Sequence, residues 1–173
     1  MGFQTLNDLF VEQLQDLYSA ETQIVEALPK LTNAASAEEL RDAFEQHLQE
    51  TREHVKRLDQ IFGQVGASPR GEKCEGMAGL IKEGEKILSK QGGDPNVVDA
   101  ALIAAAQRVE HYEIAGYGTL KTLAGHLDLG DAKDLLDRTL DEEGKADKLL
   151  TKIATGGMFK TGVNERATER AKA

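Results

Sequence analysis

The sequence predicts an all-α protein, a four-helix bundle whose second and third long helices are joined by a long crossover. Ala, Leu, Glu, Lys and Gln, which favour helices, dominate the long runs between the Gly-rich breaks. Apolar residues recur along these runs at alternating steps of three and four, the spacing of one helix face. With 173 residues, the chain is long enough for one compact domain. We therefore expect a bundle over residues 1–155 and a polar tail over residues 156–173.

The net charge of −9 and the isoelectric point near 5.0 restrict the partners of the chain. A surplus of carboxylates disfavours nucleic acid and anionic membranes, whereas it suits metal cations. The single cysteine, Cys74, cannot form an intramolecular disulfide, and residues 1–10 lack the features of a signal peptide. No run approaches the roughly 20 apolar residues that a membrane span needs. We expect a cytoplasmic protein without membrane attachment.

The first helix should begin near Thr5, whose hydroxyl would form a capping box with Asp8, and continue to about Thr32. Its inward face consists of Phe10, Leu14, Leu17, Glu21, Ile24, Leu28 and Leu31. One carboxylate, Glu21, interrupts this apolar face. A solvated position at the edge of the face is the alternative explanation for Glu21.

A second capping box, Ser36 with Glu39, predicts a helix that continues to about Gly63. Its inward face consists of Leu40, Phe44, His47, either Glu50 or Thr51, His54, Leu58, Ile61 and Val65. At 100° per residue, the two histidines and Glu50 fall within about 60° of arc, so they share one face. Each histidine could equally be a hydrogen-bonded core residue.

Residues 70–93 are less regular and form the crossover, with a short amphipathic helix over about Cys74 to Ser89. A connection of this length lets the next long helix run parallel to the second. We expect Cys74 to pack within this segment, because no histidine or basic cluster is placed to activate it as a nucleophile.

The third long helix should begin at Asp94 and Pro95 and continue to about Gly125. Its inward face consists of Ile103, Ala106, Glu110, Glu113, Tyr117, Leu120 and Ala124. Its two carboxylates lie about 60° apart around the axis and about 4.5 Å apart along it, so they could converge on one cation. Gly116 and Gly118 in the middle of this helix indicate the close approach of another helix or subunit.

The last long helix should begin between Asp128 and Asp131 and end at Gly156 and Gly157. Its inward face consists of Leu136, Leu140, Glu143, Asp147, Leu150 and Ile153, so carboxylates interrupt this face as well. The tail that follows is polar and lacks a sustained apolar face. We expect the tail to be mobile or to contact a partner.

The polar interruptions lie near the middle of all four helices, so they should meet at one level of the bundle. The inward faces carry no Lys or Arg that could neutralise these carboxylates, whereas two metal ions could. Carboxylates bind and bridge iron or manganese ions and leave positions open for a small oxidant. The pattern departs from the Glu-x-x-His steps of known bundle sites, because Glu53 and Ala146 stand where histidine is expected.

Four runs of the chain, LYSAE, HLQETREH, AALIAAAQRVEHYEIAGYGTL and LDEEGKAD, resemble the ferritin-like proteins of the YciE and YciF type. That family was once catalogued as a domain of unknown function, and the resemblance covers about residues 3–155. The resemblance implies a ferritin-like four-helix bundle with a short extra helix in the crossover, a homodimer and a di-metal centre. It also implies an association with bacterial stress responses.

The resemblance carries a set of candidate metal ligands to this chain: Glu21, Glu50, Glu110, Glu113 and Glu143. Four further side chains would be neighbours of these ligands or alternate ligands: His47, His54, Tyr117 and Asp147. The step from Glu110 to Glu113 also resembles rubrerythrin, which favours peroxide or dioxygen chemistry over iron storage.

Two hypotheses of different classes follow. The first is a stress-associated oxidoreductase with a di-iron or di-manganese centre that reacts with peroxide or dioxygen, with Glu50 and either Glu110 or Glu143 bridging the metals. The second is a stress-response structural or binding protein with a stabilising or vestigial metal site. A ferritin relative that stores iron in a cage is a third option. The chain has no Cys-x-x-Cys element, so electrons for turnover would come from elsewhere.

Overall fold

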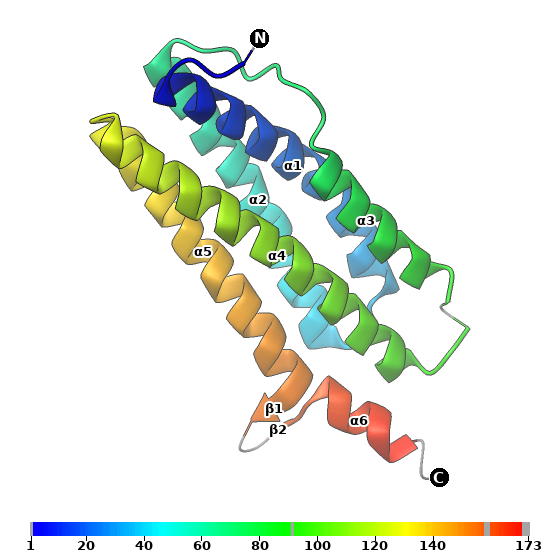
Figure 1. Cartoon of the computed structure of the whole chain (residues 1–173). Coiled ribbons are helices and arrows are strands. Elements are labelled where there is room, and N and C mark those ends of the chain that lie inside the picture. Colours follow the sequence, from blue (N-terminus) through cyan, green and yellow to red (C-terminus); the bar gives the residue numbers. More distant parts are fainter. Residues whose placement is uncertain (1, 91, 158–159, 171–173) are drawn as a thin grey trace.

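Four long helices form the bundle in the computed structural model, which describes residues 2–90, 92–157 and 160–170 (Figure 1). These are α1 (Leu6–Ala34), α2 (Glu38–Val65), α4 (Pro95–His126) and α5 (Gly130–Thr155). A shorter helix, α3 (Glu75–Leu88), lies in the crossover. A hairpin of β1 (Gly156–Gly157) and β2 (Lys160–Thr161) precedes α6 (Val163–Arg170). The predicted all-α fold with a helix in the crossover is confirmed.

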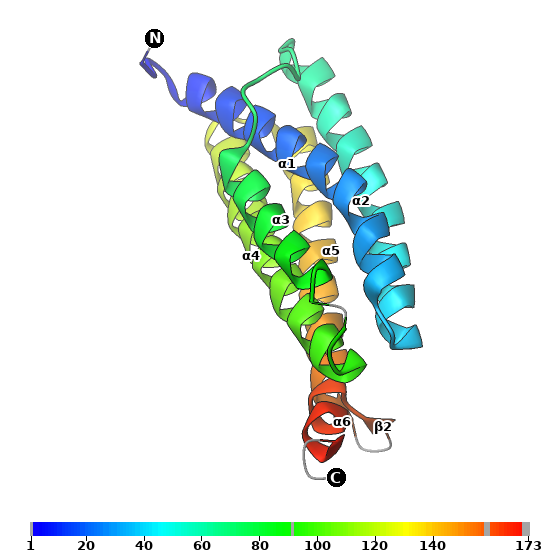
Figure 2. The same cartoon turned by 90° about the vertical axis from the view of Figure 1, so that its right-hand side faces the viewer.

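The crossover determines the order of the helices. α1 and α2 form one antiparallel pair, and α4 and α5 form the other (Figure 1). From the end of α2 the chain passes over one end of the bundle and returns along α3, so α4 runs parallel to α2 as predicted. α3 packs on the outside of the bundle against α1 and α4 (Figure 2).

The beginnings of α1 and α3 are capped by side chains of the residues that precede them. The predicted capping box is present, because Asp8 N donates to Thr5 Oγ1 at 3.1 Å and Thr5 N donates to Asp8 Oδ2 at 2.9 Å. At α3 the buried Sγ of Cys74 accepts from Met77 N at 3.4 Å. Cys74 therefore packs within this segment, as predicted from the sequence, and it also caps α3, which was not predicted.

The predicted capping box of Ser36 and Glu39 is wrong. α2 begins after Ala37, and among the described residues neither Ser36 nor Glu39 provides a side-chain cap for it. The N–H groups of Ser36 and Ala37 instead donate, at 2.8 Å each, to the two carboxylate oxygens of the buried Asp99 from α4. A partner more than 60 residues away has replaced the local cap, which a local motif cannot reveal.

The core of the bundle consists of two apolar clusters separated by a polar layer. One cluster contains Ile24, Leu28, Leu40, Phe44, Leu102 and Leu150, and the other contains Phe10, Leu14, Leu58, Ile61, Leu120 and Leu136. On every long helix the polar interruption lies between a segment of one cluster and a segment of the other. The apolar clusters therefore hold the helices in a common register on both sides of the polar layer.

The two glycines in the middle of α4 have different surroundings. A Cβ added to Gly116 would lie 2.7 Å from Leu17 Cδ2, so α1 approaches α4 closely there, as predicted. A Cβ added to Gly118 would meet none of the described atoms within 4 Å. Within the described part of the chain, the prediction of close approach therefore holds for Gly116 alone.

The segment after residue 155, expected to be a polar tail, contributes to the fold. Val163 is fully buried in the apolar core, and Arg166 Nη2 donates to Glu39 Oε1 of α2 at 3.0 Å. One valine in an eight-residue helix is too short a pattern to predict this packing. The mobility expected for residues 158–159 and 171–173 concerns positions outside the described residues. Among the helices that are described, none is long and apolar enough to cross a membrane.

Candidate metal centre

Four carboxylates and two imidazoles from all four long helices converge in the polar layer. They belong to Glu21 of α1, His47 and His54 of α2, Glu110 and Glu113 of α4, and Glu143 of α5. Each of these residues is at most 6% exposed. The structure therefore brings four of the five predicted carboxylates together at one level, with both histidines among them.

The converging atoms form two groups that share Glu143. The first, which we call the His47 subsite, contains His47, Glu110, Glu113 and Glu143. The second, which we call the His54 subsite, contains Glu21, His54 and Glu143. Within each group, one nitrogen or oxygen atom per residue lies within 4.8 Å of all the others. Either group could hold a metal ion.

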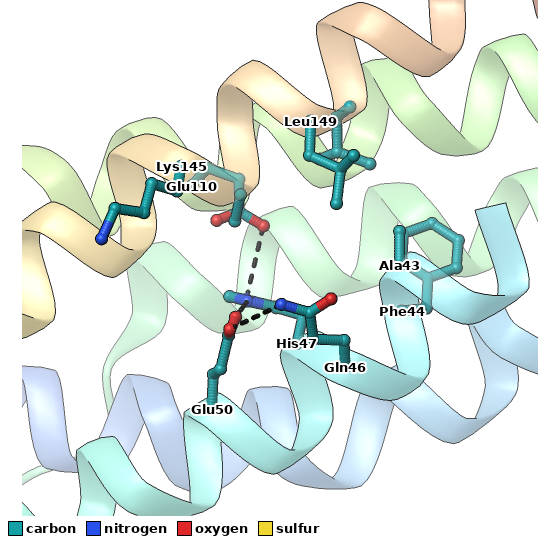
Figure 3. Close-up of a pocket in the computed structure, with 10 residues that line it drawn as sticks. Ala43, Phe44, Gln46, His47, Glu50, Glu110, Lys145 and Leu149 are labelled. Atoms are coloured by element: carbon teal, nitrogen blue, oxygen red, sulfur yellow. Dashed lines mark hydrogen bonds and ion pairs between the residues drawn. The ribbon is translucent and has the colours of Figure 1, made fainter. Parts of the chain in front are cut away.

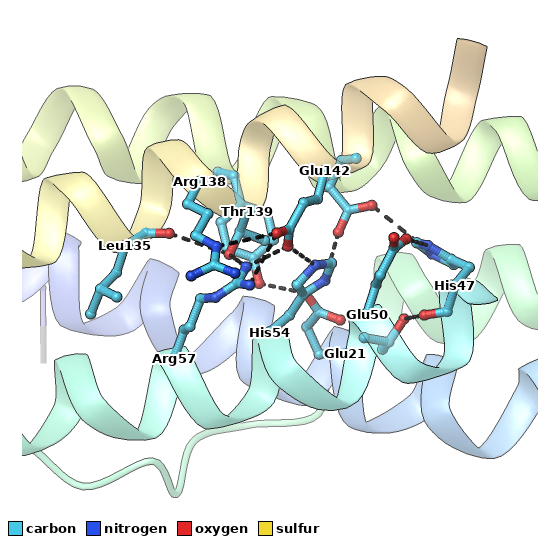
Figure 4. A network of polar contacts seen from close by, with 12 residues as sticks. Glu21, His47, Glu50, His54, Arg57, Leu135, Arg138, Thr139 and Glu142 are labelled. Carbon is cyan, nitrogen blue, oxygen red and sulfur yellow. Dashed lines mark hydrogen bonds and ion pairs between the residues drawn. The ribbon is translucent and has the colours of Figure 1, made fainter. Parts of the chain in front are cut away.

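The imidazole of His54 lies between two carboxylates on one side and a third on the other (Figure 4). Its Nδ1 atom is 3.3 Å from Glu21 Oε1 and 2.9 Å from Glu143 Oε1. Its Nε2 atom is 3.0 Å from Glu142 Oε2. Because Glu142 accepts the proton on Nε2, a neutral His54 presents the lone pair of Nδ1 to the subsite.

Glu142 is itself held in place by arginine. Arg57 Nη1 donates to Glu142 Oε2 at 2.5 Å, and Nη2 donates to Oε1 at 3.1 Å. Arg57 Nη1 also donates to Thr139 Oγ1 at 3.0 Å. Neither Arg57 nor Glu142 was predicted from the sequence, although Arg57 lies one turn after His54 on the same face and Glu142 directly precedes Glu143. Arg57 does not belong to the inward face traced in the sequence, yet it is only 8% exposed and pairs with Glu142 beside the polar layer.

Tyr117 of α4 lies at the border between the polar layer and the apolar cluster that contains Phe10, Leu58 and Leu120. Its buried hydroxyl donates to Glu21 Oε1, which leaves Glu21 Oε2 without a hydrogen-bond partner among the described residues. The predicted position of Tyr117 beside the carboxylates is confirmed. This hydrogen bond fixes one oxygen of Glu21 and leaves the other free to bind a cation.

The imidazole of His47 has looser surroundings. Its Nε2 atom is 3.4 Å from Glu110 Oε1 and 3.9 Å from Glu143 Oε2, and its Nδ1 atom is 3.8 Å from Glu50 Oε2. Neither nitrogen has a hydrogen-bond partner within the described chain. A cavity of about 250 Å³ between α2 and α5 reaches His47 and Glu110 (Figure 3).

Glu50, predicted as a bridging ligand, lies outside both subsites. Its side chain is 32% exposed and accepts from Gln46 Nε2 at 2.9 Å. Thr51 takes the inward position instead and is fully buried. Steps of four and three residues lead from His47 through Thr51 to His54, whereas Glu50 lies about 60° to the side of His47. The shared position belongs to Glu143, one of the two alternatives for a second bridge.

Asp147 also lies apart from the two subsites. Its Oδ1 atom accepts from Gln107 Nε2 at 2.9 Å and is 3.4 Å from Nε2 of the exposed His111. These partners are on the outer part of α4. The step of four residues from Glu143 turns Asp147 toward this edge of the α4–α5 interface.

Nine buried nitrogen and oxygen atoms of the polar layer have no hydrogen-bond partner within the described residues. They include both carboxylate oxygens of Glu113 and of Glu143, both nitrogens of His47, and one atom each of Glu21, His54 and Glu110. A buried polar atom without a partner costs about 1–3 kcal/mol, and more when it is charged. Because cations would satisfy these atoms together, the donor set fits metal ions.

The electrostatics of the layer agree with this fit. Burial raises the pKa values of Glu110 and Glu113 well above their ordinary range, and it also raises the pKa of Glu21. Burial would lower the pKa of His47, but the carboxylates of Glu110, Glu50, Glu143 and Glu21 together outweigh burial and raise the pKa to about 9. Burial would raise the pKa of Glu143, but its contacts with the imidazoles lower it. The metal-free layer therefore holds protons that cations would displace.

A crossover bundle with a buried layer of carboxylates and histidines belongs to the ferritin-like class. The ferritin-like fold occurs in a two-domain protein from Anabaena variabilis, whose structure matches 99% of this chain and 40% of that chain. That match has a TM-score of 0.56 at 17% identity and supports the fold alone. The chain belongs to the family described as Domain of unknown function (DUF892), whose model matches residues 5–168.

The relatives agree with this family. Protein YciF of Escherichia coli strain K12 is 44% identical over 166 residues, which are 95% of this chain and 99% of YciF. The crystal structure of the E. coli stress protein YciF has a TM-score of 0.82 at 45% identity and covers 87% of this chain and 94% of that chain. YcfI of Rhodopseudomonas palustris, whose proposed role is structural, has a TM-score of 0.83 at 42% identity and covers 87% of this chain and 96% of that chain. The resemblance stated from the sequence is therefore confirmed.

Proposed function

We propose that the polar layer binds two metal ions, iron or manganese, one in each subsite, with Glu143 as the shared ligand. The observation that carries this proposal is the pair Glu113 and Glu143. Both are fully buried, and none of their four carboxylate oxygens accepts a hydrogen bond of good geometry within the described chain, although Glu143 Oε1 forms an ion-pair contact with His54 Nδ1 at 2.9 Å. Imidazole and carboxylate donors together suit iron and manganese.

We propose further that the protein is a stress-associated oxidoreductase. Bound iron or manganese would supply redox chemistry toward peroxide or dioxygen at coordination positions that the protein leaves open. The chain contributes the orientation of the ligands, since Glu142 holds His54 and Tyr117 holds Glu21. Burial of the layer excludes bulk water. The description of YciF as a stress protein supports the association with stress.

Metal content tests the proposal most simply. We expect protein produced in iron-rich or manganese-rich medium to retain two metal ions per chain by elemental analysis. Glu110→Ala should lose the ion of the His47 subsite, whereas the matched change Glu53→Ala should lose none, because the Glu53 side chain is 55% exposed and pairs with Lys56. Consumption of peroxide or dioxygen by the loaded protein would support the oxidoreductase. Full metal content in Glu110→Ala would contradict the ligand assignment.

The second candidate is a structural or binding protein whose metal ions only stabilise the bundle. The proposed structural role of YcfI favours this candidate. It predicts that chelation lowers the melting temperature while peroxide and dioxygen consumption stay at background. We also propose a cytoplasmic homodimer. Measuring the mass of the native particle would distinguish this dimer from an iron-storing cage.

A further inference from the structure

Two separate cavities reach the same two side chains, His47 and Glu110. The larger, of about 250 Å³, lies between α2 and α5. The smaller, of about 40 Å³, lies on the other side of His47, where α3 covers α1 and α4. The two cavities differ in chemistry. Apart from His47 and Glu110, the smaller one is lined entirely by apolar side chains and a glycine, whereas Glu50, Gln46 and Lys145 also line the larger one.

Glu50 lies between solvent and the His47 subsite. Its side chain is 32% exposed, and its Oε2 atom is 3.8 Å from Nδ1 of His47. The His47 side chain is only 7% exposed, and its Nδ1 has no hydrogen-bond partner within the described residues. Figure 3 shows the Glu50 carboxylate facing this imidazole, with Glu110 on its far side. Carboxylate, imidazole and carboxylate therefore follow one another from the cavity into the buried layer.

We propose that the larger cavity admits divalent cations to the buried layer and that Glu50 with His47 Nδ1 forms a transient cation site within it. This inference rests on the proposed function. A cation captured by Glu50 exchanges part of its water shell for a carboxylate oxygen and an imidazole nitrogen, and the imidazole releases its proton to solvent. The bond between the cation and Nδ1 then breaks as the cation passes to the buried layer, where Glu110 lies 3.4 Å from Nε2 of the same ring.

The smaller cavity does not provide this route. A cation that crossed it would lose water among Leu28, Leu80 and Val109 without gaining ligands. In the larger cavity the basic side chains among the described lining residues are Lys145 and His47, whose proton an entering cation would displace. Lys145 is exposed, and Figure 3 shows it extending away from Glu50 and His47. Glu50 is therefore the partly exposed carboxylate that a cation entering this cavity meets.

The rate of metal loading tests this route separately from the number of ions bound. Metal-free full-length protein would be mixed with Co(II), which forms absorbing complexes with imidazole and carboxylate and stays divalent, and absorbance would be followed by stopped flow. Glu50→Gln should load about tenfold more slowly than wild type, because a charge that steers association raises the rate by 10- to 1,000-fold. The final content of two ions should not change.

Two further variants complete the experiment. Glu53→Gln removes the same charge one turn away on α2, outside the residues that line the cavity, and should load at the wild-type rate. Ala146→Leu narrows the cavity without a change of charge and should slow loading. Loading of Glu50→Gln at the wild-type rate would overturn the route and leave the metal centre standing. If Glu50→Gln holds one ion fewer than wild type at equilibrium, Glu50 is a permanent ligand and its transient role is overturned. If neither wild type nor any variant binds Co(II), the proposed function itself is overturned.

Discussion

The two subsites share Glu143 but are supported in different ways. In the His54 subsite, the imidazole contacts Glu142 through Nε2, and Arg57 holds Glu142 with two hydrogen bonds. In the His47 subsite, neither imidazole nitrogen has a hydrogen-bond partner in the described chain, and a cavity adjoins the ring. The first arrangement fixes the orientation of its histidine before a metal binds, whereas the second provides no such hydrogen bond to the ring.

This difference suggests a division of roles within one buried layer. An imidazole oriented by a second hydrogen bond binds metal more tightly than one without such support. We therefore expect the His54 subsite to hold its ion firmly. The His47 subsite, next to the cavity, would exchange ions and admit the oxidant. The following predictions test this contrast.

Loss of the shared ligand should have the largest effect. Glu143→Ala removes an oxygen donor from both subsites and should reduce the metal content from two ions per chain to nearly none. Glu110→Ala should retain the ion of the His54 subsite. Elemental analysis of both variants after the same metal loading makes the comparison. Equal metal content in the two variants would show that Glu143 is not shared.

Removal of the support of His54 should weaken one subsite selectively. Glu142→Ala leaves His54 without its partner on Nε2 and should lower the affinity of the His54 subsite by about 10- to 100-fold. The His47 subsite should keep its affinity. Titration calorimetry with Co(II) resolves the two steps. Arg138→Ala is the control, because Arg138 contacts Glu142 only from the surface and its side chain is 68% exposed.

The stability of the metal-free protein should fall as the pH rises above neutral. The pKa is raised to about 9 for His47 and to about 10 for His54, because the neighbouring carboxylates outweigh the effect of burial. This stabilisation is fully present below the ordinary histidine pKa of 6.5 and is lost as the pH rises through 9 and then 10. Thermal melts between pH 6 and 10 would measure the loss.

The two histidines should account for different parts of that pH profile. His47→Gln should remove the part of the loss that runs from pH 6.5 to about 9, and His54→Gln the part that runs from pH 6.5 to about 10. The pKa of Glu143 is lowered, so its contribution has the opposite sign: it is present above pH 4.5 and lost as the pH falls. A metal-free protein of constant stability from pH 6 to 10 would contradict the arrangement of charges described here.

The smallest expected effect concerns the glycines of α4. Gly116→Ala would place a Cβ 2.7 Å from Leu17 Cδ2 and should destabilise the protein by about 1–3 kcal/mol. Since Leu17 lies one turn before Glu21 on α1, the shift should weaken the His54 subsite more than the His47 subsite. Gly118→Ala meets no described atom within 4 Å and should stabilise the helix by up to about 1 kcal/mol. Denaturant melts and Co(II) titration of both variants provide the comparison.

Periodicity predicted the helices and most of the polar layer, because a carboxylate on an apolar face is conspicuous and its neighbours fix the level at which it lies. Glu21, Glu110, Glu113 and Glu143 were predicted in this way. Periodicity could not decide between Glu50 and Thr51. Consecutive residues lie about 100° apart around a helix, which is within the width of an inward face. The choice depends on how α2 is rotated against α5.

The features that sequence analysis missed depend on distant partners. Asp99 caps the beginning of α2 from α4, and Arg57 holds Glu142 across the α2–α5 interface. Val163 is buried only because the chain turns back after β2. Each is a single residue whose partner is known only after the helices are assembled. The support of His54, on which the contrast between the subsites rests, is therefore a product of tertiary structure.

An anomalous-difference map of the iron-loaded or manganese-loaded crystal, collected at the absorption edge of that metal, tests the central claim directly. We predict two peaks per chain. One should lie within bonding distance of His54 Nδ1 and Glu21, and the other within bonding distance of His47 and Glu110. Glu143 should be within bonding distance of both peaks. Absence of metal from the polar layer in a crystal soaked with excess metal would contradict the account, as would a single peak that contacts neither histidine.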